Sequence, residues 1–454
     1  MRIRIILPGL AILFFFSTCR NTGKSVDDTG FLDTLSRHTF NWFWDVAGAE
    51  NGQVPDRWPT KNFSSIAATG FGLSAYLVGV ERGYITRGQA AERTLKTLQF
   101  LYNLPKGDSA SDVAGYKGFF YHFLDQETGL RFQQVELSTI DTGLLMAGIL
   151  SSQSFFDQDN DSEKQIRRLA DSLYRAVEWN WAMDNKSVMS MGWHPEKGFI
   201  EATWQGYNEG MILYILALGS PTHTIPAESW KSWTSTYQWT TYQGQEFVNF
   251  GPLFAHQYSH MYIDFKGIQD EYMKSKKIDY FENSRRATYA NRQYCITNAA
   301  GFTGYSNNIW GLTACDGPGN NNKANPNVAF QGYNARGASQ FYLQDDGTIA
   351  PTAAGGSIAF APEICIPALK EMRSRYGEKL YGKYGFKDAF NLSIVYKDGT
   401  VGWYDQDYLG IDQGPILIQT ENYRSGLVWK LMKKNPYIRA GLKKAGFTGG
   451  WLDE

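Results

Sequence analysis

Six stretches of this chain have helical length, little charge and many apolar or small residues, and they alternate with charged amphipathic stretches. The charge-poor stretches span 64–80, 139–156, 209–219, 250–263, 353–369 and 412–432. A helix that is apolar on every side is buried in a globular core. A membrane-spanning role is disfavoured, because each run is short and interrupted by Gly, Pro, His or Ser. The alternation predicts an all-α (α/α)6 barrel, in which an inner ring of buried helices is wrapped by an outer ring.

The outer ring is predicted from amphipathic patterns. The clearest one spans 86–104, where Thr86 and Gln89 have the spacing of a capping box. A similar pattern over 162–181 begins with a box at Ser162. The less regular candidates for outer helices are 31–46, 268–294, 226–237 and 377–384.

Long polar and aromatic loops lead into several of the inner helices. They span 116–136, 187–207, 299–352 and 389–411, and the last contains strand-like pieces that predict a small hairpin. Long loops inside a compact domain usually carry function. We therefore expect the functional face of the barrel at the N-terminal ends of the inner helices.

Three carboxylates stand where charge-poor helices begin: Asp141, Glu209 and Asp412. If those helices stand side by side, the carboxylates meet at one mouth. Clustered acids in a hollow fit the cleavage of glycosidic bonds, in which one acid donates a proton while another activates water. Burial at the start of an otherwise uncharged helix is expected to raise the pKa of Glu209 towards that of a general acid. The alternative for each is a structural acid that interacts with the helix dipole.

Other acids compete for a role. Glu136 lies just before Asp141 and is expected to orient substrate or to form a loop salt bridge. Asp388, Asp405, Asp407 and Asp412 are all candidates for the base that activates water, and the sequence does not choose among them. Asp412, followed by Gln-Gly-Pro, also fits a plain helix N-cap.

Aromatic residues make up 15% of the chain, including 14 Trp. Flat rings with a polar edge suit both protein cores and sugar-stacking surfaces. The candidates for stacking on a sugar are Trp193, Trp204, Tyr207, Trp310 and Trp403, with core packing as the alternative for each.

His256, His260 and Asp264 recur along one helix face, which makes a zinc site an alternative to consider for them. Gln257 stands where the usual two-His motif has Glu, so His256 and His260 are instead expected to bind substrate by hydrogen bonds. No calcium loop or phosphate loop is present, and we expect no metal and no cofactor. The net charge of −1 gives no electrostatic case for nucleic acid as a partner.

The first 19 residues resemble a secretory signal, with Arg2 and Arg4 before an apolar run. The run ends at Cys19 in a loose bacterial lipoprotein box, and the alternative is an ordinary cleaved signal. We expect a lipid anchor on Cys19, a polar tether over 20–30 and a single catalytic domain over 31–454. This organisation favours a monomer held at the periplasmic or outer surface of a Gram-negative membrane.

Four runs together resemble one protein family. They are Ser-Thr-Ile-Asp-Thr at 138–142, Trp-Gln-Gly-Tyr-Asn-Glu-Gly at 204–210, Ile-Trp-Gly-Leu-Thr at 309–313 and Gly-Ile-Asp-Gln-Gly-Pro at 410–415. They are similar to those of the bacterial glucoamylase-like proteins, which include the β-1,2-glucanases of glycoside hydrolase family 144. The resemblance covers most of the chain after the tether.

The resemblance implies an (α/α)6 barrel that hydrolyses glucan by an inverting mechanism without metal. It matches Glu209 to the general acid and leaves the base among the C-terminal acids. The preferred substrate is β-1,2-glucan or its oligosaccharides. The alternatives are a glucoamylase-like enzyme acting on α-glucan, a non-catalytic glycan-binding lipoprotein and a polysaccharide lyase.

Overall fold

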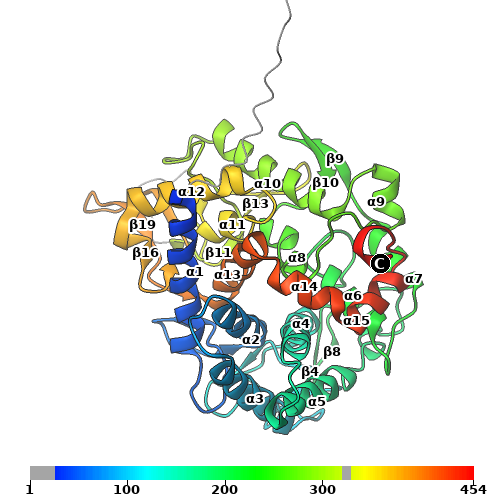
Figure 1. Cartoon of the computed structure of the whole chain (residues 1–454). Helices are drawn as coiled ribbons and strands as arrows, with labels where there is room; N and C mark the ends of the chain where they lie inside the picture. The colour runs from blue at the N-terminus through cyan, green and yellow to red at the C-terminus, as the bar shows by residue number, and fades with distance from the viewer. Residues whose placement is uncertain (1–25, 320–328) are drawn as a thin grey trace, which may run out of the picture.

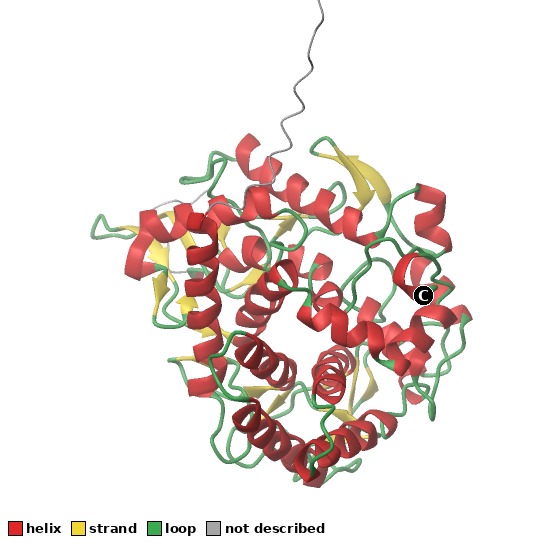
Figure 2. Cartoon of the chain, viewed as in Figure 1, coloured by secondary structure: helices red, strands yellow, loops and turns green. Residues whose placement is uncertain are grey.

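The computed structural model describes residues 26–319 and 329–454. Its helices form a double ring, seen along the ring axis in Figures 1 and 2. The inner ring consists of α2 (Ile66–Glu81), α4 (Thr139–Phe155), α6 (Met211–Gly219), α8 (Tyr258–Tyr262), α11 (Pro351–Gly355) and α13 (Gly410–Arg424). Helix α2 packs on both α4 and α13, so the ring closes between the two ends of the chain. The predicted (α/α)6 barrel is confirmed.

The outer ring contains helices that are charged on their solvent side. Its members are α1 (Val26–Val46), α3 (Arg87–Asn103), α5 (Asp161–Arg175), α7 (Glu228–Thr234), α10 (Tyr280–Thr297) and α12 (Pro362–Tyr376), supplemented by α9 (Glu271–Lys276), α14 (Leu427–Lys434) and α15 (Pro436–Lys444). The capping box of Thr86 and Gln89 is present at α3. At α5 the cap is Asn160 rather than Ser162, because the Asn160 side chain accepts the backbone N–H of Glu163. Helix α1 begins inside the segment expected as a tether.

Four predicted helices are divided in the structure. The stretch 250–263 is a 3-10 turn (Leu253–His256) followed by α8, and 353–369 spans the inner α11 and the outer α12. The stretch 268–294 is α9 and α10, separated at Lys277, whose φ is 59°. The stretch 412–432 divides into α13 and α14 at Gly426, whose φ is 69°. The stretch 377–384 holds a 3-10 turn and a strand, so it is not an outer helix.

Small residues let the inner helices approach closely. A Cβ added at Gly70 of α2 would lie 2.6 Å from the carbonyl oxygen of Leu144 in α4, and one at Gly148 would lie 2.0 Å from the carbonyl oxygen of Gly70. Glycine in a helix costs about 1 kcal/mol relative to alanine. Here that cost is offset by a contact between two backbones that no larger residue permits.

The strands are short and lie in the loops. The longest are β18 (Phe390–Val395) and β19 (Val401–Tyr404), which form the predicted hairpin, and β9 (Trp239–Tyr242) and β10 (Gln245–Val248). The strands β2 (Ser64–Ser65), β6 (Leu137–Ser138) and β20 (Tyr408–Leu409) each precede an inner helix. The others are β1 (Arg57–Trp58), β3 (Gly115–Tyr116), β4 (Phe119–Phe120), β5 (Phe123–Leu124), β7 (Gly192–His194), β8 (Gly198–Phe199), β11 (Ala314–Cys315), β12 (Asn334–Ala335), β13 (Gly337–Ala338), β14 (Leu343–Gln344), β15 (Thr348–Ile349), β16 (Tyr381–Gly382) and β17 (Gly385–Phe386).

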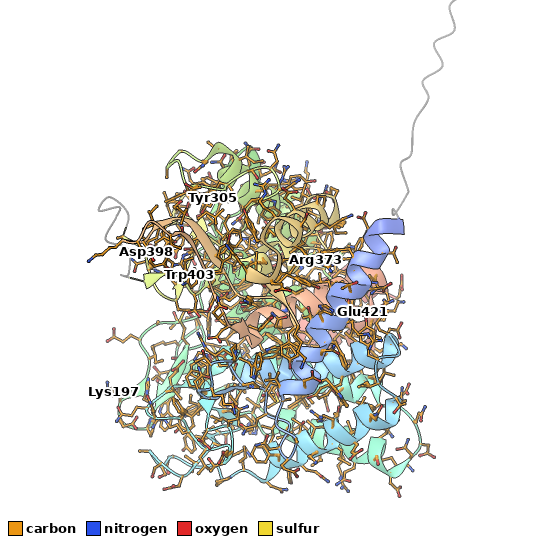
Figure 3. All side chains as sticks on the ribbon, turned by 90° about the vertical axis from the view of Figure 1, so that its left-hand side faces the viewer. Lys197, Tyr305, Arg373, Asp398, Trp403 and Glu421 are labelled. Carbon is orange, nitrogen blue, oxygen red and sulfur yellow. The ribbon has the colours of Figure 1, made fainter. Side chains whose placement is uncertain are left out.

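The two ends of the ring differ in what covers them. In the side view of Figure 3, Lys197, Asp398 and Trp403, from loops and a hairpin before inner helices, lie at one end. Glu421 and Arg373, near the C-terminal ends of α13 and α12, lie towards the other end. The loops therefore gather where the inner helices begin.

Two further points concern the cysteine residues and the possibility of membrane-spanning helices. Cys19 lies outside the described residues. Cys295, Cys315 and Cys365 are buried and free. Within the described ranges, every helix is too short or too polar to cross a membrane.

Candidate active site

A cavity of about 380 Å³ opens where α4, α6 and α13 begin. Its lining includes His122, Glu136, Ser138, Asp141, Trp204, Glu209, Phe254, Tyr258, Tyr333 and Ile411. Larger hollows lie on the outer surface between α3 and α5 and beside α7 and α9, but none of the predicted acids lines them. The cavity is therefore the candidate active site.

Short strands fix where the inner helices begin. Ser138 ends β6, which pairs with β7, and its hydroxyl accepts the backbone N–H of Asp141 in the first turn of α4. The same hydroxyl donates to the Asp141 carboxylate at 2.5 Å. This N-cap holds the Asp141 side chain at the start of the helix, against the cavity.

Glu209 lies in the turn before α6, two residues ahead of its first helical residue, Met211. Its carbonyl oxygen accepts a hydrogen bond from Ser259 at 3.1 Å, and its buried Oε2 atom has no hydrogen-bond partner among the described residues. Burial raises the pKa of the Glu209 carboxyl to about 7, and the nearby charge of Asp141 adds to this rise. A carboxyl group with this pKa holds a proton near neutral pH and can donate it.

His122 connects two of the predicted acids. Its Nδ1 lies 2.7 Å from Glu136 Oε1, and its Nε2 lies 3.5 Å from Asp141 Oδ2. Burial lowers the His122 pKa, but the charges of Asp141 and Glu136 outweigh it and raise the pKa to about 9. The imidazolium therefore stays charged between two carboxylates at neutral pH. Sequence reasoning missed His122, because no spacing signal links it to acids that follow it in the chain.

A second acid group lies beside the start of α13. Asp412, in the first turn, lies within hydrogen-bonding distance of the Asp388 carboxyl group. Within residues 26–319 and 329–454, its buried Oδ2 atom has no other donor. Asp388 is also buried and accepts the backbone N–H of Asp316 at 2.7 Å. Burial and the charge of Asp412 raise the pKa of Asp388 well above its usual value. One proton shared between Asp388 and Asp412 accounts for this arrangement.

Tyr258 of α8 links the two acid groups across the cavity. Burial raises the pKa of its phenol, and Asp412, Glu209 and Asp141 all lie close enough for their charges to add to this rise. Of the three acids predicted to meet at one mouth, Asp141 and Glu209 line the cavity, whereas Asp412 is buried outside its lining, near enough to Tyr258 for its charge to act on that phenol. Asp405 lies behind Asp388, while Asp407 accepts the backbone N–H of Thr60 at 2.9 Å and has a structural role.

Of the predicted substrate-binding residues, Glu136 and Trp204 line the cavity. The indole Nε1 of Trp204 donates to Thr139 Oγ1 at 2.9 Å, which fixes the ring beside Glu209. Trp193 is absent from the lining: its ring packs on Tyr116 and Trp181 in an aromatic cluster.

Tyr207, His256 and His260 are core residues, which corrects their prediction as ligands. The Tyr207 ring packs on His256 at 4.7 Å, and His260 packs on Phe265 and accepts or donates one hydrogen bond with Ser284. Burial lowers the pKa of His256 to about 3, so its ring is neutral. Asp264 forms a salt bridge with Lys433 at 2.6 Å and so does not join the histidines in a metal site.

Trp310 and Trp403 also lie away from the cavity. Trp310 is fully buried in the core. Trp403 of β19 lines a separate surface hollow and packs on Cys315, Ala350 and Ala389. Trp310 therefore satisfies the core-packing alternative, whereas Trp403 is partly buried and lines neither the core nor the cavity.

Comparison with known proteins gives the family. A family model described as "Putative glucoamylase" matches residues 201–436, just over half of the chain. The exo β-1,2-glucooligosaccharide sophorohydrolase (non-reducing end) of Parabacteroides distasonis is 31% identical over 461 residues, which cover 94% of this chain and 59% of that protein. The chain belongs to the glucoamylase-like family of glycoside hydrolases. The resemblance seen in the sequence is confirmed.

Solved structures of glucoamylase-like proteins have the same fold. A "putative glucoamylase" from Bacteroides uniformis is 35% identical with a TM-score of 0.83, over 95% of this chain and 100% of that one. An endo-β-1,2-glucanase from Chitinophaga pinensis, solved with sophorotriose and glucose, is 32% identical with a TM-score of 0.81, over 94% of this chain and 100% of that one.

Proposed function

We propose that this glucoamylase-like protein hydrolyses β-1,2-glucan or its oligosaccharides, with Glu209 as the general acid. The observation that carries the proposal is a buried carboxyl group in a sugar-sized cavity, with a pKa of about 7 and a free Oε2 atom. The substrate rests on two relatives that are named for β-1,2-linked glucans. The chain spans 59% of the first of these, so that protein's activity is carried over as a proposal.

The mechanism follows from the two acid groups. Glu209 protonates the glycosidic oxygen, and Asp412 activates the attacking water, with Asp388 holding the proton that the two aspartates share. Asp412 is favoured over Asp388 as the base because it directly follows the cavity residue Ile411 in the first turn of α13, and its charge acts on the cavity residue Tyr258. We infer inversion of the anomeric centre, which requires room for a water molecule between acid and base. Glu209 precedes α6 and Asp412 begins α13, so the two groups come from different parts of the inner ring.

The remaining groups raise the pKa of Glu209, hold its neighbours in place or contact the sugar. Asp141 lies close enough to Glu209 for its negative charge to favour the protonated form of that carboxyl. His122 holds Asp141 and Glu136 in place as their charged partner. Glu136 and Trp204 line the cavity and contact the sugar.

The test is hydrolysis of linkage-defined glucans by the purified protein. We expect new reducing ends from β-1,2-glucan and none from starch. Glu209→Gln keeps the side-chain size but removes the proton donor, so turnover should fall by about 10²–10⁴-fold, the usual contribution of general acid catalysis. Glu92→Gln on the exposed side of α3 is the matched control and should act like the wild type.

Three outcomes would contradict the proposal. Starch cleavage in place of β-1,2-glucan cleavage would favour an α-glucan enzyme. Glucan binding without products from any glucan would favour a glycan-binding protein. Near-normal turnover by Glu209→Gln would remove Glu209 from the mechanism.

We also propose export and lipid anchoring at Cys19, with the enzyme a monomer at the periplasmic or outer surface of a Gram-negative membrane. The support is the charged and apolar order of the first 19 residues. Labelling with a radioactive fatty acid in a Gram-negative host should mark the wild type and not Cys19→Ser. Equal labelling, or none, would contradict the anchor.

A further inference from the structure

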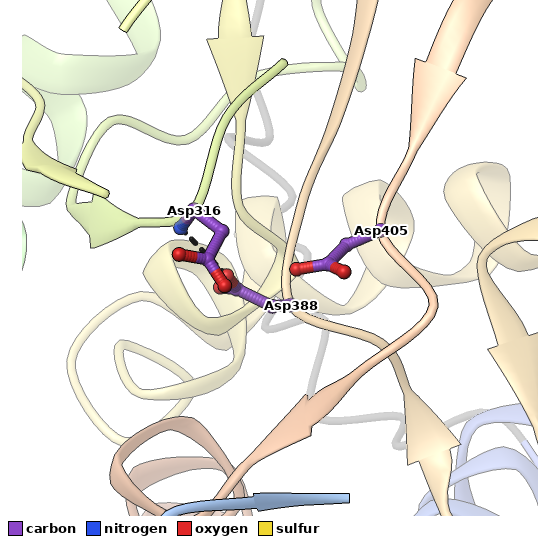
Figure 4. Close-up of side chains that lie close together, drawn as sticks. All are labelled: Asp316, Asp388 and Asp405. Carbon is purple, nitrogen blue, oxygen red and sulfur yellow. Dashed lines mark hydrogen bonds between the residues drawn. The ribbon is translucent and has the colours of Figure 1, made fainter. Parts of the chain in front are cut away.

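Three aspartates from distant parts of the chain meet behind the cavity wall. Asp316 follows β11, Asp388 lies between β17 and β18, and Asp405 follows β19. Figure 4 shows their carboxyl groups turned towards one another. One carboxylate oxygen from each lies within 4.8 Å of those of the other two.

Two of these side chains are buried with an oxygen that has no donor. Asp388 is 1% exposed and Asp405 is 9% exposed. Asp405 Oδ2 has no hydrogen-bond partner in the part of the chain that the structure describes, and Asp388 Oδ1 has no donor there other than the proton shared with Asp412. A buried polar atom without a partner is costly, and native proteins usually satisfy it with water, a proton or an ion.

The nearby cation pairs with only one of the three aspartates. Arg57 contacts Asp316 Oδ2 at 2.6 Å and Asp56 Oδ2 at 3.0 Å, so its guanidinium is already shared. Within residues 26–319 and 329–454, neither Asp388 nor Asp405 has a Lys, Arg or His nitrogen within 4.0 Å. The two buried carboxyl groups therefore need positive charge from protons or from a bound ion.

We propose that Asp316, Asp388 and Asp405 bind one divalent cation through oxygen atoms, and that the cation is Ca²⁺. Calcium binds oxygen at about 2.3–2.6 Å, so one ion joins oxygens that lie up to about 5 Å apart. This range covers the spacing of 4.8 Å. Magnesium requires about 2.0–2.1 Å and a regular octahedron, and zinc prefers nitrogen and sulfur, so both fit this all-carboxylate set less well.

The ion would be structural, and its binding is measured without the hydrolase reaction, although one of its ligands, Asp388, is also the partner of the proposed base Asp412. None of its three ligands lines the cavity. It would tie the loop after β11 to the end of β19, and these segments lead to Asp412 through β20. Sequence reasoning missed the site because its ligands are far apart in the chain and form no metal motif.

The test uses full-length protein treated with EDTA and desalted at neutral pH. We expect titration calorimetry with CaCl₂ to give one saturable site per chain, and binding of TbCl₃ to give emission sensitised by Trp403, which packs beside Ala389. Asp405→Asn keeps the acceptor for the Asp407 backbone N–H but removes the charge, so Ca²⁺ affinity should fall at least tenfold. Asp398→Asn at the exposed tip of the hairpin is the matched control and should bind like the wild type.

Thermal unfolding separates an ion from protons. With an ion site, CaCl₂ raises the unfolding temperature of the wild type and of Asp398→Asn, but not that of Asp405→Asn. With protons alone, CaCl₂ leaves the unfolding temperature of all three proteins unchanged. That result, or the absence of saturable binding to the wild type, would overturn the proposal even if Asp405→Asn did not fold. Tighter binding of MgCl₂ than of CaCl₂ would overturn the choice of calcium.

Discussion

The two acid groups at the barrel mouth satisfy their charges in opposite ways. On the side of α4 and α6, His122 stands between Glu136 and Asp141, and Ser138 donates to Asp141, so two carboxylates have defined partners. On the side of α13, Asp388, Asp405 and Asp412 are buried with oxygens that lack donors, and Arg57 serves other acids.

The difference shows which carboxyl groups have a protonation state that is determined by their protein neighbours. Beside Glu209 the neighbouring carboxylates have defined partners, and burial holds the Glu209 carboxyl group protonated near neutral pH. Beside Asp412 the charge depends on what binds there, whether proton or cation. A hydrolase needs both behaviours, because its acid must keep a proton and its base must lose one.

The largest loss of turnover is expected from Asp412→Asn, in the acid group beside α13. If Asp412 activates water, its amide cannot do so, and turnover should fall by about 10²–10⁴-fold. The measurement is the rate of release of reducing ends under saturating β-1,2-glucan. Asp388→Asn should have a smaller effect, because it removes a partner rather than the base. The reverse order would assign the base to Asp388.

A smaller effect is expected on the pH profile. Activity of the wild type should fall as pH rises through about 7, because Glu209 then loses its proton. In His122→Gln the positive charge is gone and Asp141 acts on Glu209 uncompensated, so this limb should move to higher pH by roughly half a unit. His223→Gln, in a loop away from the cavity, should leave the limb in place.

Stability gives a second measurement of His122. Its pKa is raised from 6.5 to about 9 in the folded protein, so its contribution to stability is fully present below pH 6.5 and is lost as pH rises through about 9. His122→Gln should therefore lower the unfolding temperature more at pH 6 than at pH 10. If the alkaline fall in activity stayed at the same pH and the loss of stability were equal at pH 6 and pH 10, the charge of His122 would have no role.

The inner ring and its acids were predictable because their signals are local. A run without charge identifies a buried helix, and an acid at its first turn is positioned by the helix itself, so the meeting of Asp141, Glu209 and Asp412 follows once the ring closes. The small residues of α2 and α4 also indicated closely packed inner helices, since Gly70 and Gly148 allow the two backbones to touch.

The rest of the site depends on contacts between loops. His122 reaches Asp141 through the pairing of short strands, and Asp388 reaches Asp412 through the turn that precedes β18. No periodic pattern in the sequence predicts either contact. The helix breaks at Lys277 and Gly426 arise from left-handed residues inside patterns that look continuous.

The aromatic residues show most clearly that contacts between loops cannot be predicted from the sequence. The smallest expected effect, a change in KM, also concerns them. Trp204 and Trp193 looked alike as stacking platforms, yet only Trp204 lines the cavity, while Trp193 packs on Tyr116 and Trp181. Trp204→Phe should raise KM about two- to tenfold with little change in kcat, because an aromatic contact contributes about 0.5–1.5 kcal/mol. Trp193→Phe should leave both constants near the wild-type values. If Trp193→Phe instead raised KM as much as Trp204→Phe, the sugar chain would extend beyond the cavity onto the loop of β7, and the acid groups would mark only one end of the binding site.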